Sequence, residues 1–361
     1  MKKEPKILVC PLNWGLGHAT RIVPIVKQLN NQNFDVWVAA SGDSLIFLKK
    51  QFPKLNYIDF PNYKVKYSSS DSQALKFLLA IPKIIIGTLK EHYQINKIIK
   101  DNNFAVVISD NRYGLWNRLA YNVFITHQLN IKLPNSFKIF ESILMLLVRK
   151  IINNYDECWI PDYKGEYSIA GELVHPSSLK NLHYIGLLSR YKNQTEVEPE
   201  EKEIDLLYVL SGPEPQRTIF EELICKQLTN NKDRVAVVRG TSSKRKQGYS
   251  FPVYDLLNSE ELLSLIIKSE IIVCRSGYSS IMDLIALNKK ALLIPTPGQT
   301  EQEYLAEYLK NKGLFNFVKQ NNFNVDEAVQ KVFNSIENKI YTSDDILKGR
   351  ILLIKEKQNY K

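Results

Sequence analysis

The sequence has few cysteines, and their positions are not those of a metal site. Only four occur among the 361 residues: Cys10, Cys158, Cys225 and Cys274. No two are spaced as Cys-x-x-Cys, and no histidine lies at a zinc-ligand spacing from them, so we expect no metal centre. Three of the four end or interrupt apolar runs, which is typical of buried thiols in a reduced protein.

Long hydrophobic runs are also missing. The most apolar segments, 77–89 and 139–152, are too short to cross a bilayer, and each contains a charged residue. The segment 1–11 runs directly into a predicted strand and shows no signal-peptide cleavage site. We therefore expect a cytoplasmic protein, and contact with the inner face of a membrane stays open.

Acidic residues are scarce in one half of the chain only. Residues 1–190 hold 24 Lys and Arg but 14 Asp and Glu, whereas residues 191–361 hold 24 of each, so the net charge of +10 belongs to the first half. Such a charge suits nucleic acid, an anionic membrane or an acidic substrate. The best local support for nucleic acid is the basic run 243–246, which is short and has no interleaved aromatic residue, so we expect no nucleic-acid partner.

Short β-rich runs alternate with longer helical patterns, which predicts parallel strands joined by crossover helices. The pattern stops in the polar, acidic segment 190–203 and then restarts. We expect an α/β protein with two doubly wound domains, 1–189 and 204–341, a linker at 190–203, and a last helix in 342–361 that packs back on the first domain. The predicted strands are 6–11, 34–40, 55–60, 104–110, 122–127, 157–162, 204–210, 234–240, 270–276 and 290–296. The predicted helices of the first domain are 19–31, 43–51, 72–101, 113–121 and 136–153.

A glycine-containing turn follows the first predicted strand. In open α/β sheets ligands bind beyond the carboxyl ends of the strands, which is where this turn lies. Gly15 and Gly17 permit a tight turn and close backbone approach, His18 is suited to act as a base or a donor, and Arg21 follows one helical turn later. The alternative is a packing turn with a capping histidine.

Two further polar residues end strands of the first domain. Asp110 follows the apolar run 105–108 and is a candidate base, or a group that orients His18. The alternative is an N-cap for the predicted helix 113–121. His127 ends the next strand and is a weaker acceptor-side candidate, because a hydrogen-bonded structural histidine is commoner.

The second domain has a possible phosphate loop after its first strand. Ser211 and Gly212 are small enough for a phosphate to approach, and Arg217 lies one helical turn further on. Arg239 ends the next strand at the same edge and offers a second guanidinium. The alternative is an ordinary helix start with proline in the first turn.

The strongest motif is the turn at 275–283. A buried strand ends in Arg275, Ser276 and Gly277, and a helix then begins with Tyr278 and Ser279. Backbone N–H groups, hydroxyls and the positive end of a helix dipole together form an anion cradle.

Polar residues that suit a nucleotide sugar surround this cradle. Asp283 lies one helical turn in and would accept hydrogen bonds from ribose hydroxyls. The loop after the next strand carries Gln299, Glu301 and Gln302, whose amides and carboxylate suit sugar hydroxyls. Its alternative reading is a capping box from Thr300 to Glu303.

These residues resemble a known family. The stretch 270–309 is similar to the donor-binding region of GT-B glycosyltransferases, most of all family 28, which includes the peptidoglycan lipid-intermediate N-acetylglucosaminyltransferases. The segment 15–18 is similar to the family's glycine-rich turn that ends in histidine. The acidic residue is Asp283 where the family has glutamate, and loop 211–215 contains two prolines, so we expect a paralogue with another acceptor.

The resemblance implies two Rossmann-like domains with an interdomain cleft and a donor nucleotide in the second. It implies inverting transfer of a hexose, GlcNAc or a related sugar, from a UDP-sugar substrate to a hydroxyl acceptor such as a lipid-linked one, without a cofactor or obligatory metal. His18 is our first candidate for the base and Asp110 the second. The alternatives are a UDP-sugar 2-epimerase, a nucleotide-sugar hydrolase and a non-catalytic sugar-nucleotide-binding subunit.

Overall fold

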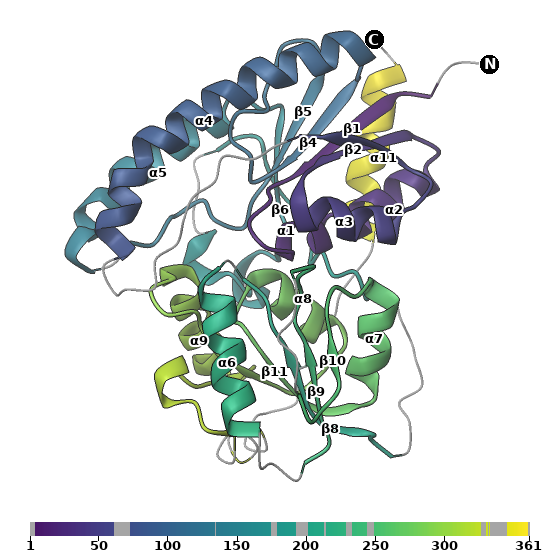
Figure 1. Cartoon of the computed structure of the whole chain (residues 1–361). Coiled ribbons are helices and arrows are strands. Elements are labelled where there is room, and N and C mark those ends of the chain that lie inside the picture. The colour runs from purple at the N-terminus through teal and green to yellow at the C-terminus, as the bar shows by residue number, and fades with distance from the viewer. Residues whose placement is uncertain are drawn as a thin grey trace.

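The computed structural model describes residues 4–60, 73–133, 135–174, 179–192, 201–212, 214–228, 233–243, 249–325, 330, 332 and 345–359. Residues 193–200 of the expected linker and residues 244–246 of the basic run lie outside this part of the chain. The prediction of two α/β units is confirmed, and Figure 1 shows them one above the other, each with its own sheet.

The N-terminal domain contains a seven-stranded parallel sheet in the order β3-β2-β1-β4-β5-β6-β7. Along β1, Ile7 and Val9 pack with helices of one face, while Leu8 and Cys10 pack with Ile95 on the other face. Such two-sided burial is what a parallel sheet with near-continuous apolar strands requires. The strands are β1 (Lys6–Pro11), β2 (Asp35–Ala40), β3 (Asn56–Asp59), β4 (Val106–Asp110), β5 (Tyr121–Ile125), β6 (Glu157–Ile160) and β7 (Leu182–Tyr184). The helices are α1 (Gly17–Arg21), α2 (Val23–Asn31), α3 (Gly42–Gln51), α4 (Gln73–Asn102), the 3-10 helix η1 (Asn135–Phe140) and α5 (Glu141–Ile152), followed by two 3-10 turns, η2 (Gly165–Tyr167) and η3 (Gly171–Leu173).

The C-terminal domain contains a six-stranded parallel sheet in the order β10-β9-β8-β11-β12-β13. Helix α7 begins with a capping box in which Asn258 and Glu261 satisfy each other's backbone N–H groups. The strands are β8 (Ile204–Val209), β9 (Val235–Val238), β10 (Val253–Tyr254), β11 (Ser269–Cys274), β12 (Ala291–Leu293) and β13 (Asn316–Phe317). The helices are α6 (Gln216–Leu228), α7 (Ser259–Ile267), α8 (Tyr278–Ala286), α9 (Thr300–Asn311) and the 3-10 turn η4 (Gln320–Asn322).

Strand register brings the motifs of each domain to one edge. Pro11 of β1 pairs with Asp110 of β4, so the turn after β1 and this carboxylate leave the sheet together. In the second sheet Val209 of β8 pairs with Cys274 of β11, which places Ser211 beside the turn that starts α8. The two edges face each other, because α1 of the first domain contacts α8 of the second.

The helix expected at 113–121 is absent. These residues form turns and bends, and Tyr121 already begins β5. Asn111 adopts a positive φ of 56°, and the Asn117 side chain accepts hydrogen bonds from the N–H groups of Leu119 and Ala120. This side chain takes the place of helical backbone partners, so Asp110 caps no helix here.

The last helix, α11 (Asp345–Asn359), packs against α2 of the N-terminal domain. Ile351 and Ile354 are fully buried in this contact. Arg350 and Lys357 form ion pairs with Glu157, which is buried at the start of β6. The C-terminal segment therefore returns across the molecule to the first domain. No helix of the described part of the chain is long and apolar enough to cross a membrane.

Replacing Ile354 with alanine should lower the free energy of unfolding by about 2–4 kcal/mol, because it leaves a cavity beneath α11. The neighbouring Leu353, which is 42% exposed, offers a matched control whose change to alanine should cost less than about 1 kcal/mol. Urea unfolding measures both. Equal losses for the two variants would show that α11 does not pack as described.

Candidate active site

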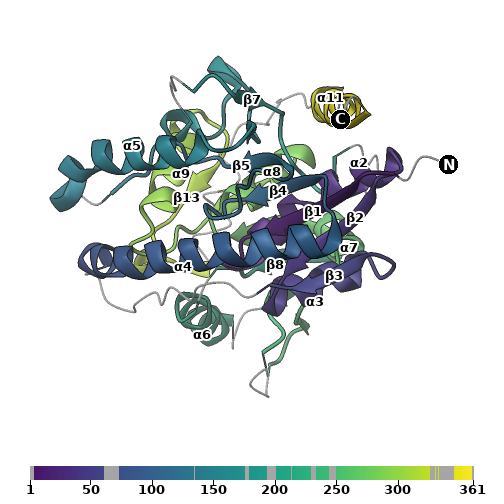
Figure 2. The same cartoon turned by 90° about the horizontal axis from the view of Figure 1, so that it is seen from above.

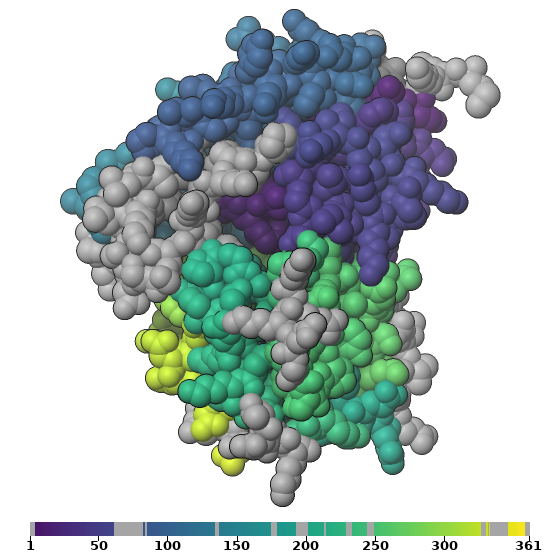
Figure 3. Space-filling model, in the orientation of Figure 1, coloured from purple at the N-terminus to yellow at the C-terminus, as the bar shows by residue number. Residues whose placement is uncertain are grey.

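A cavity of about 350 Å³ lies where the two domains meet, and both contribute to its wall. In Figure 3 the purple and blue N-terminal domain closes on the green C-terminal domain along this seam. The N-terminal domain contributes the turn after β1 and the residues after β5, and the C-terminal domain contributes the ends of β8 and β9 and the starts of α8 and α9. The strand-end motifs therefore converge in one place.

The turn after β1 touches the second domain directly. Gly15 has a φ of 72°, which favours glycine, and a Cβ added there would lie 3.7 Å from the backbone of Gly212. The Ser279 hydroxyl donates to the Gly17 carbonyl over 2.7 Å. These contacts join the loops of the two domains. The Ser279 hydroxyl, which we expected in the anion cradle, donates its hydrogen bond to this contact between the domains.

His18, Arg21 and Asp110 form one hydrogen-bonded group. The Nδ1 atom of His18 lies 3.1 Å from Oδ2 of Asp110 and 2.8 Å from Nη2 of Arg21. Arg21 also pairs with both carboxylate oxygens of Asp110, with its Nε 3.2 Å from Oδ2. Burial alone would raise the pKa of Asp110, but Arg21 and His18 outweigh it and hold this pKa below its ordinary value.

His18 and Arg21 of this group line the cavity, and of the two only the imidazole of His18 can accept a proton. The His18 side chain is 14% exposed and lines the wall, whereas Asp110 is fully buried beneath it. Asp110 therefore cannot reach an acceptor hydroxyl, and its place is that of a group that orients His18.

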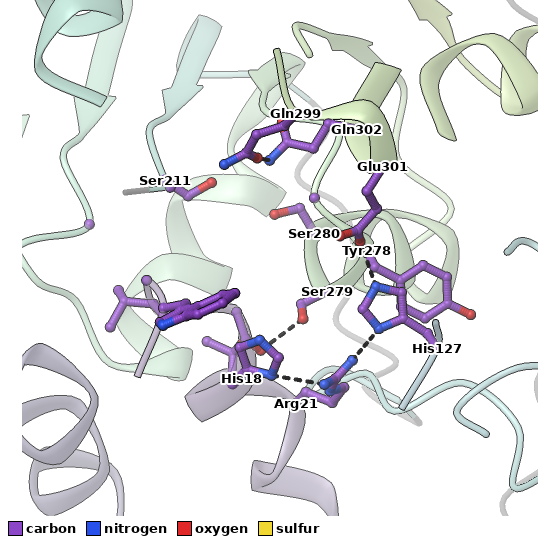
Figure 4. Close-up of a pocket in the computed structure, with 18 of the residues that line it drawn as sticks. His18, Arg21, His127, Ser211, Tyr278, Ser279, Ser280, Gln299, Glu301 and Gln302 are labelled. Atoms are coloured by element: carbon purple, nitrogen blue, oxygen red, sulfur yellow. Dashed lines mark hydrogen bonds and ion pairs between the residues drawn. The ribbon is translucent and has the colours of Figure 1, made fainter. Parts of the chain in front are cut away.

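A second imidazole joins the two domains. His127 accepts a hydrogen bond at Nδ1 from Nη1 of Arg21 over 2.7 Å, and its Nε2 lies 2.5 Å from Oε1 of Glu301 at the start of α9. The ring stacks on Tyr278 with centroids 4.3 Å apart. Burial lowers the pKa of His127, although Glu301 opposes this, and His127 in turn helps to lower the pKa of Glu301. Figure 4 shows His18, Arg21, His127 and Glu301 joined in this way.

The start of α8 is open toward the cavity. Its N-cap residue, Gly277, has no side chain that could accept a hydrogen bond from the backbone N–H groups of the first turn. Gly277, Ser280, Ser211 and Gly212 all line the cavity around this helix end. The arrangement suits an anion such as a phosphate.

Three arginines that we expected to bind phosphate have protein partners instead. Arg217 and Arg239 are buried in ion pairs with Glu221. Arg275 donates to the backbone carbonyl of Gln216 and to the side chain of Gln320, and burial lowers its pKa to about 9. None of the three lines the cavity. The hydrogen bonds and ion pairs of each guanidinium hold the surrounding turns in place. A buried guanidinium that is used in this way cannot also reach a ligand in the cavity.

Three other expected donor residues, Ser276, Gln299 and Gln302, also have protein partners. Ser276 is buried and donates to the backbone carbonyl of Gln302 over 2.8 Å, so it supports the loop and does not line the cavity. The Gln302 side chain donates to Gln299 over 2.6 Å and accepts from the N–H of Thr296. Gln299 and Gln302 both line the cavity, so this hydrogen-bonded pair holds the loop in shape at its wall.

Asp283 lines the cavity but is occupied by Ser189, the last residue of the expected first domain, and by Arg190, the first residue of the expected linker. It accepts hydrogen bonds from the Ser189 hydroxyl over 2.8 Å and from Nε of Arg190 over 3.0 Å. Burial raises the pKa of Asp283, and Arg190 opposes this. Arg190 itself lines the cavity. Sequence reasoning missed this residue because it lies at the start of a polar segment without periodicity.

Other lining residues had no signal in the sequence. They belong to loops whose positions depend on tertiary packing, although Trp14 stands next to the glycine turn and was within reach of a motif argument. These residues are Trp14, Gln128, Ile131, Lys132, Leu133, Leu257 and Leu262. Within the described residues no group of three or more His, Cys, Asp or Glu side chains is placed to hold a metal ion.

Two facing parallel sheets with a cleft between their strand ends are the architecture of GT-B glycosyltransferases. Residues 207–355 match the glycosyltransferase family 28 C-terminal domain. The chain is therefore a glycosyltransferase of the GT-B fold, and its residues 207–355 are similar to the C-terminal domain of glycosyltransferase family 28.

Relatives cover most of the chain at low identity. A protein of Methanosarcina mazei described as an uncharacterized glycosyltransferase is 22% identical over 325 residues, which are 85% of this chain and 84% of the relative. The UDP-N-acetylglucosamine--N-acetylmuramyl-(pentapeptide) pyrophosphoryl-undecaprenol N-acetylglucosamine transferase of Histophilus somni is 22% identical over 365 residues, 94% of this chain and 92% of that protein. Among solved structures, the glycotransferase of kitacinnamycin has a TM-score of 0.60 at 11% identity, covers 99% of this chain and 96% of its own, and shows the shared fold.

Changing Asp110 to asparagine should lower the free energy of unfolding by about 3–5 kcal/mol at neutral pH, because Arg21 stays buried without its counter-charge. The folded-state pKa of Asp110 lies below its ordinary value of 3.8, so its stabilisation is complete above that value and is lost as the pH falls through the lowered pKa. Urea unfolding should therefore show a gap between wild type and variant that narrows in acid.

The matched control is Asp59, which also ends a strand but is exposed. Its change to asparagine should alter stability by less than about 0.5 kcal/mol at every pH. Similar losses for the two variants would contradict the buried pairing of Asp110 with Arg21.

Proposed function

We propose that the protein transfers a hexose, GlcNAc or a related sugar, from a UDP-sugar to a hydroxyl acceptor with inversion and without a required metal ion. The observation that carries this proposal is that His18 and the open start of α8 line the same cavity from opposite domains. One supplies an acid–base group, and the other a site for the charge that develops on the leaving group.

The donor would bind mainly to the C-terminal domain. Its phosphates suit the N–H groups at the start of α8 and the neighbouring Ser211 and Gly212. The nucleoside suits the apolar wall made by residues such as Leu257 and Leu262, next to Arg190. Backbone N–H groups would thus bind the phosphates in place of the expected arginines.

The sugar would lie beside the loop that starts α9. Gln299, Glu301 and Gln302 line the cavity there. The Glu301 side chain is 31% exposed, and its Oε1 atom is already held by His127. An oriented carboxylate of this kind is suited to accept hydrogen bonds from sugar hydroxyls.

Transfer would proceed by direct displacement. His18 takes the proton of the acceptor hydroxyl at Nε2 while the hydroxyl oxygen forms a bond to the anomeric carbon. The bond from that carbon to the phosphate oxygen breaks, and its electron pair leaves with UDP. Asp110 acts through His18, because its burial keeps it from the acceptor.

Changing His18 to alanine should lower turnover by about 10²–10⁴-fold, because the general base is lost. UDP should bind as in the wild type, since His18 belongs to the opposite domain. The control is His183→Ala in β7, outside the cavity, which should keep full turnover. Unchanged turnover in the His18 variant would contradict its assignment as the base.

A panel of UDP-sugars, scored by thermal shift and by transfer with lipid-linked and glycan acceptors, tests the whole proposal. A donor at one hundred times its Kd should stabilise the protein by about 2.7 kcal/mol. UDP release without any acceptor indicates a hydrolase, solvent deuterium at sugar C2 an epimerase, and binding without turnover a non-catalytic subunit. No shift with any uridine nucleotide would contradict the donor site.

An exposed apolar surface supports a membrane-bound acceptor. Its residues form one face on each of two helical segments, and we name it the apolar ridge: Ile85, Ile86, Leu89 and Tyr93 of α4, with Ile139, Phe140, Ile143, Leu146 and Leu147 of η1 and α5. Both segments project from the same side of the N-terminal domain (Figures 1 and 2). Exposed Lys83, Lys90, Lys138 and Lys150 accompany them.

The apolar ridge is also close to the cavity along the chain. Ile131, Lys132 and Leu133 line the cavity, and η1 begins two residues later at Asn135. Apolar side chains with flanking lysines bind anionic membranes, and residues 131–133 connect this surface to the cavity that His18 lines. The four exposed lysines beside this surface are part of the excess positive charge of the first half of the chain.

Changing Ile143 and Leu146 together to glutamate should reduce the partition of the protein onto anionic vesicles by at least about tenfold, because two apolar side chains no longer enter the interface. Flotation with vesicles of neutral and of anionic lipid measures this. Ile46→Glu, at an equally exposed position of α3, is the matched control and should not alter binding. Absence of wild-type binding, or equal binding by both variants, would contradict membrane docking.

A further inference from the structure

Arg21 contacts both imidazoles of the cleft at the same ring position. Its Nη2 lies 2.8 Å from Nδ1 of His18, and its Nη1 lies 2.7 Å from Nδ1 of His127. A guanidinium stays protonated in proteins and offers only donors. Each contact is therefore a hydrogen bond only if the imidazole nitrogen that faces Arg21 carries no proton.

The surroundings of His127 agree with this assignment independently. Its Nε2 lies 2.5 Å from Oε1 of Glu301, an atom that can only accept when the carboxylate is ionised. Nε2 must then carry the ring proton, which leaves Nδ1 free to accept from Arg21. Both contacts of His127 require the same tautomer.

At His18 two groups compete for one atom. A proton on Nδ1 would let it donate to Oδ2 of Asp110, 3.1 Å away, but would oppose the closer N–H group of Arg21. Asp110 does not need that proton, because Arg21 already donates to both of its oxygens. The arrangement favours an unprotonated Nδ1 and places the proton on Nε2.

We propose that Arg21 is a positioning residue that holds the proton of His18 on Nε2, so that His18 rests as a hydrogen-bond donor toward the cavity, while at His127 Arg21 and Glu301 favour the same tautomer together. This inference rests on the proposed role of His18, which needs a free Nε2 to act as the base. Before transfer the ring must exchange tautomers, with Nδ1–H donated to Asp110 in place of the contact from Arg21. Arg21 thereby separates a resting from a basic form of His18.

The test is the ¹⁵N NMR spectrum of the imidazoles in the ligand-free, full-length protein, recorded about two pH units above the usual histidine pKa. The chain has five histidines, and the His18→Gln and His127→Gln variants assign the two rings. We expect pyridine-like Nδ1 and pyrrole-like Nε2 signals for both. A pyrrole-like Nδ1 on His18 in the wild type would overturn the inference.

Arg21→Lys provides the matched variant. Lysine keeps the positive charge beside Asp110 but lacks the planar fork that reaches both rings and the carboxylate. We expect His18 to change to the Nδ1–H tautomer, donated to Asp110, while His127 keeps its tautomer because Glu301 still holds Nε2. Unchanged signals for His18 in this variant would also overturn the inference. The spectra do not depend on turnover, so they fail or succeed independently of the proposed function.

Discussion

The buried pairing of Arg21 with Asp110 is the interaction on which the site depends. Asp110 is fully buried and Arg21 is 1% exposed, so each is tolerated only because the other compensates its charge. The pair fixes helix α1 to the end of β4 and sets the position of His18. Through His127 it extends to Glu301 in the other domain. One ion pair thus orients the groups on both sides of the cleft.

The division of work between the domains follows from parallel sheets. Every strand of such a sheet ends at the same edge, so loops far apart in the chain gather there. In the first domain that edge supplies acid–base groups, and in the second it supplies backbone N–H groups at the start of α8. The apolar ridge and the excess positive charge both belong to the first domain.

Sequence patterns predicted the sheets well because buried parallel strands are continuous apolar runs, as in residues 6–11 and 269–274. They also pointed to His18, Asp110 and the start of α8, which lie at or directly beneath the cavity wall and whose roles stay predictions. The prediction of a helix at 113–121 was wrong because the Asn117 side chain accepts the hydrogen bonds of backbone N–H groups in this loop. The expected arginine ligands have buried protein partners that the strand-end argument did not consider: Glu221 lies one helical turn after Arg217 on α6 and also pairs with Arg239. Arg190 was missed because it begins a polar segment without periodicity.

The most direct test of this interpretation is a crystal structure with UDP bound. We expect the phosphates within hydrogen-bond distance of the backbone N–H groups at residues 278–280, with the nucleoside beside Leu257 and His18 facing the terminal phosphate from the opposite domain. UDP bound outside the interdomain cavity, or phosphates held by Arg217 and Arg239 in place of the start of α8, would contradict it.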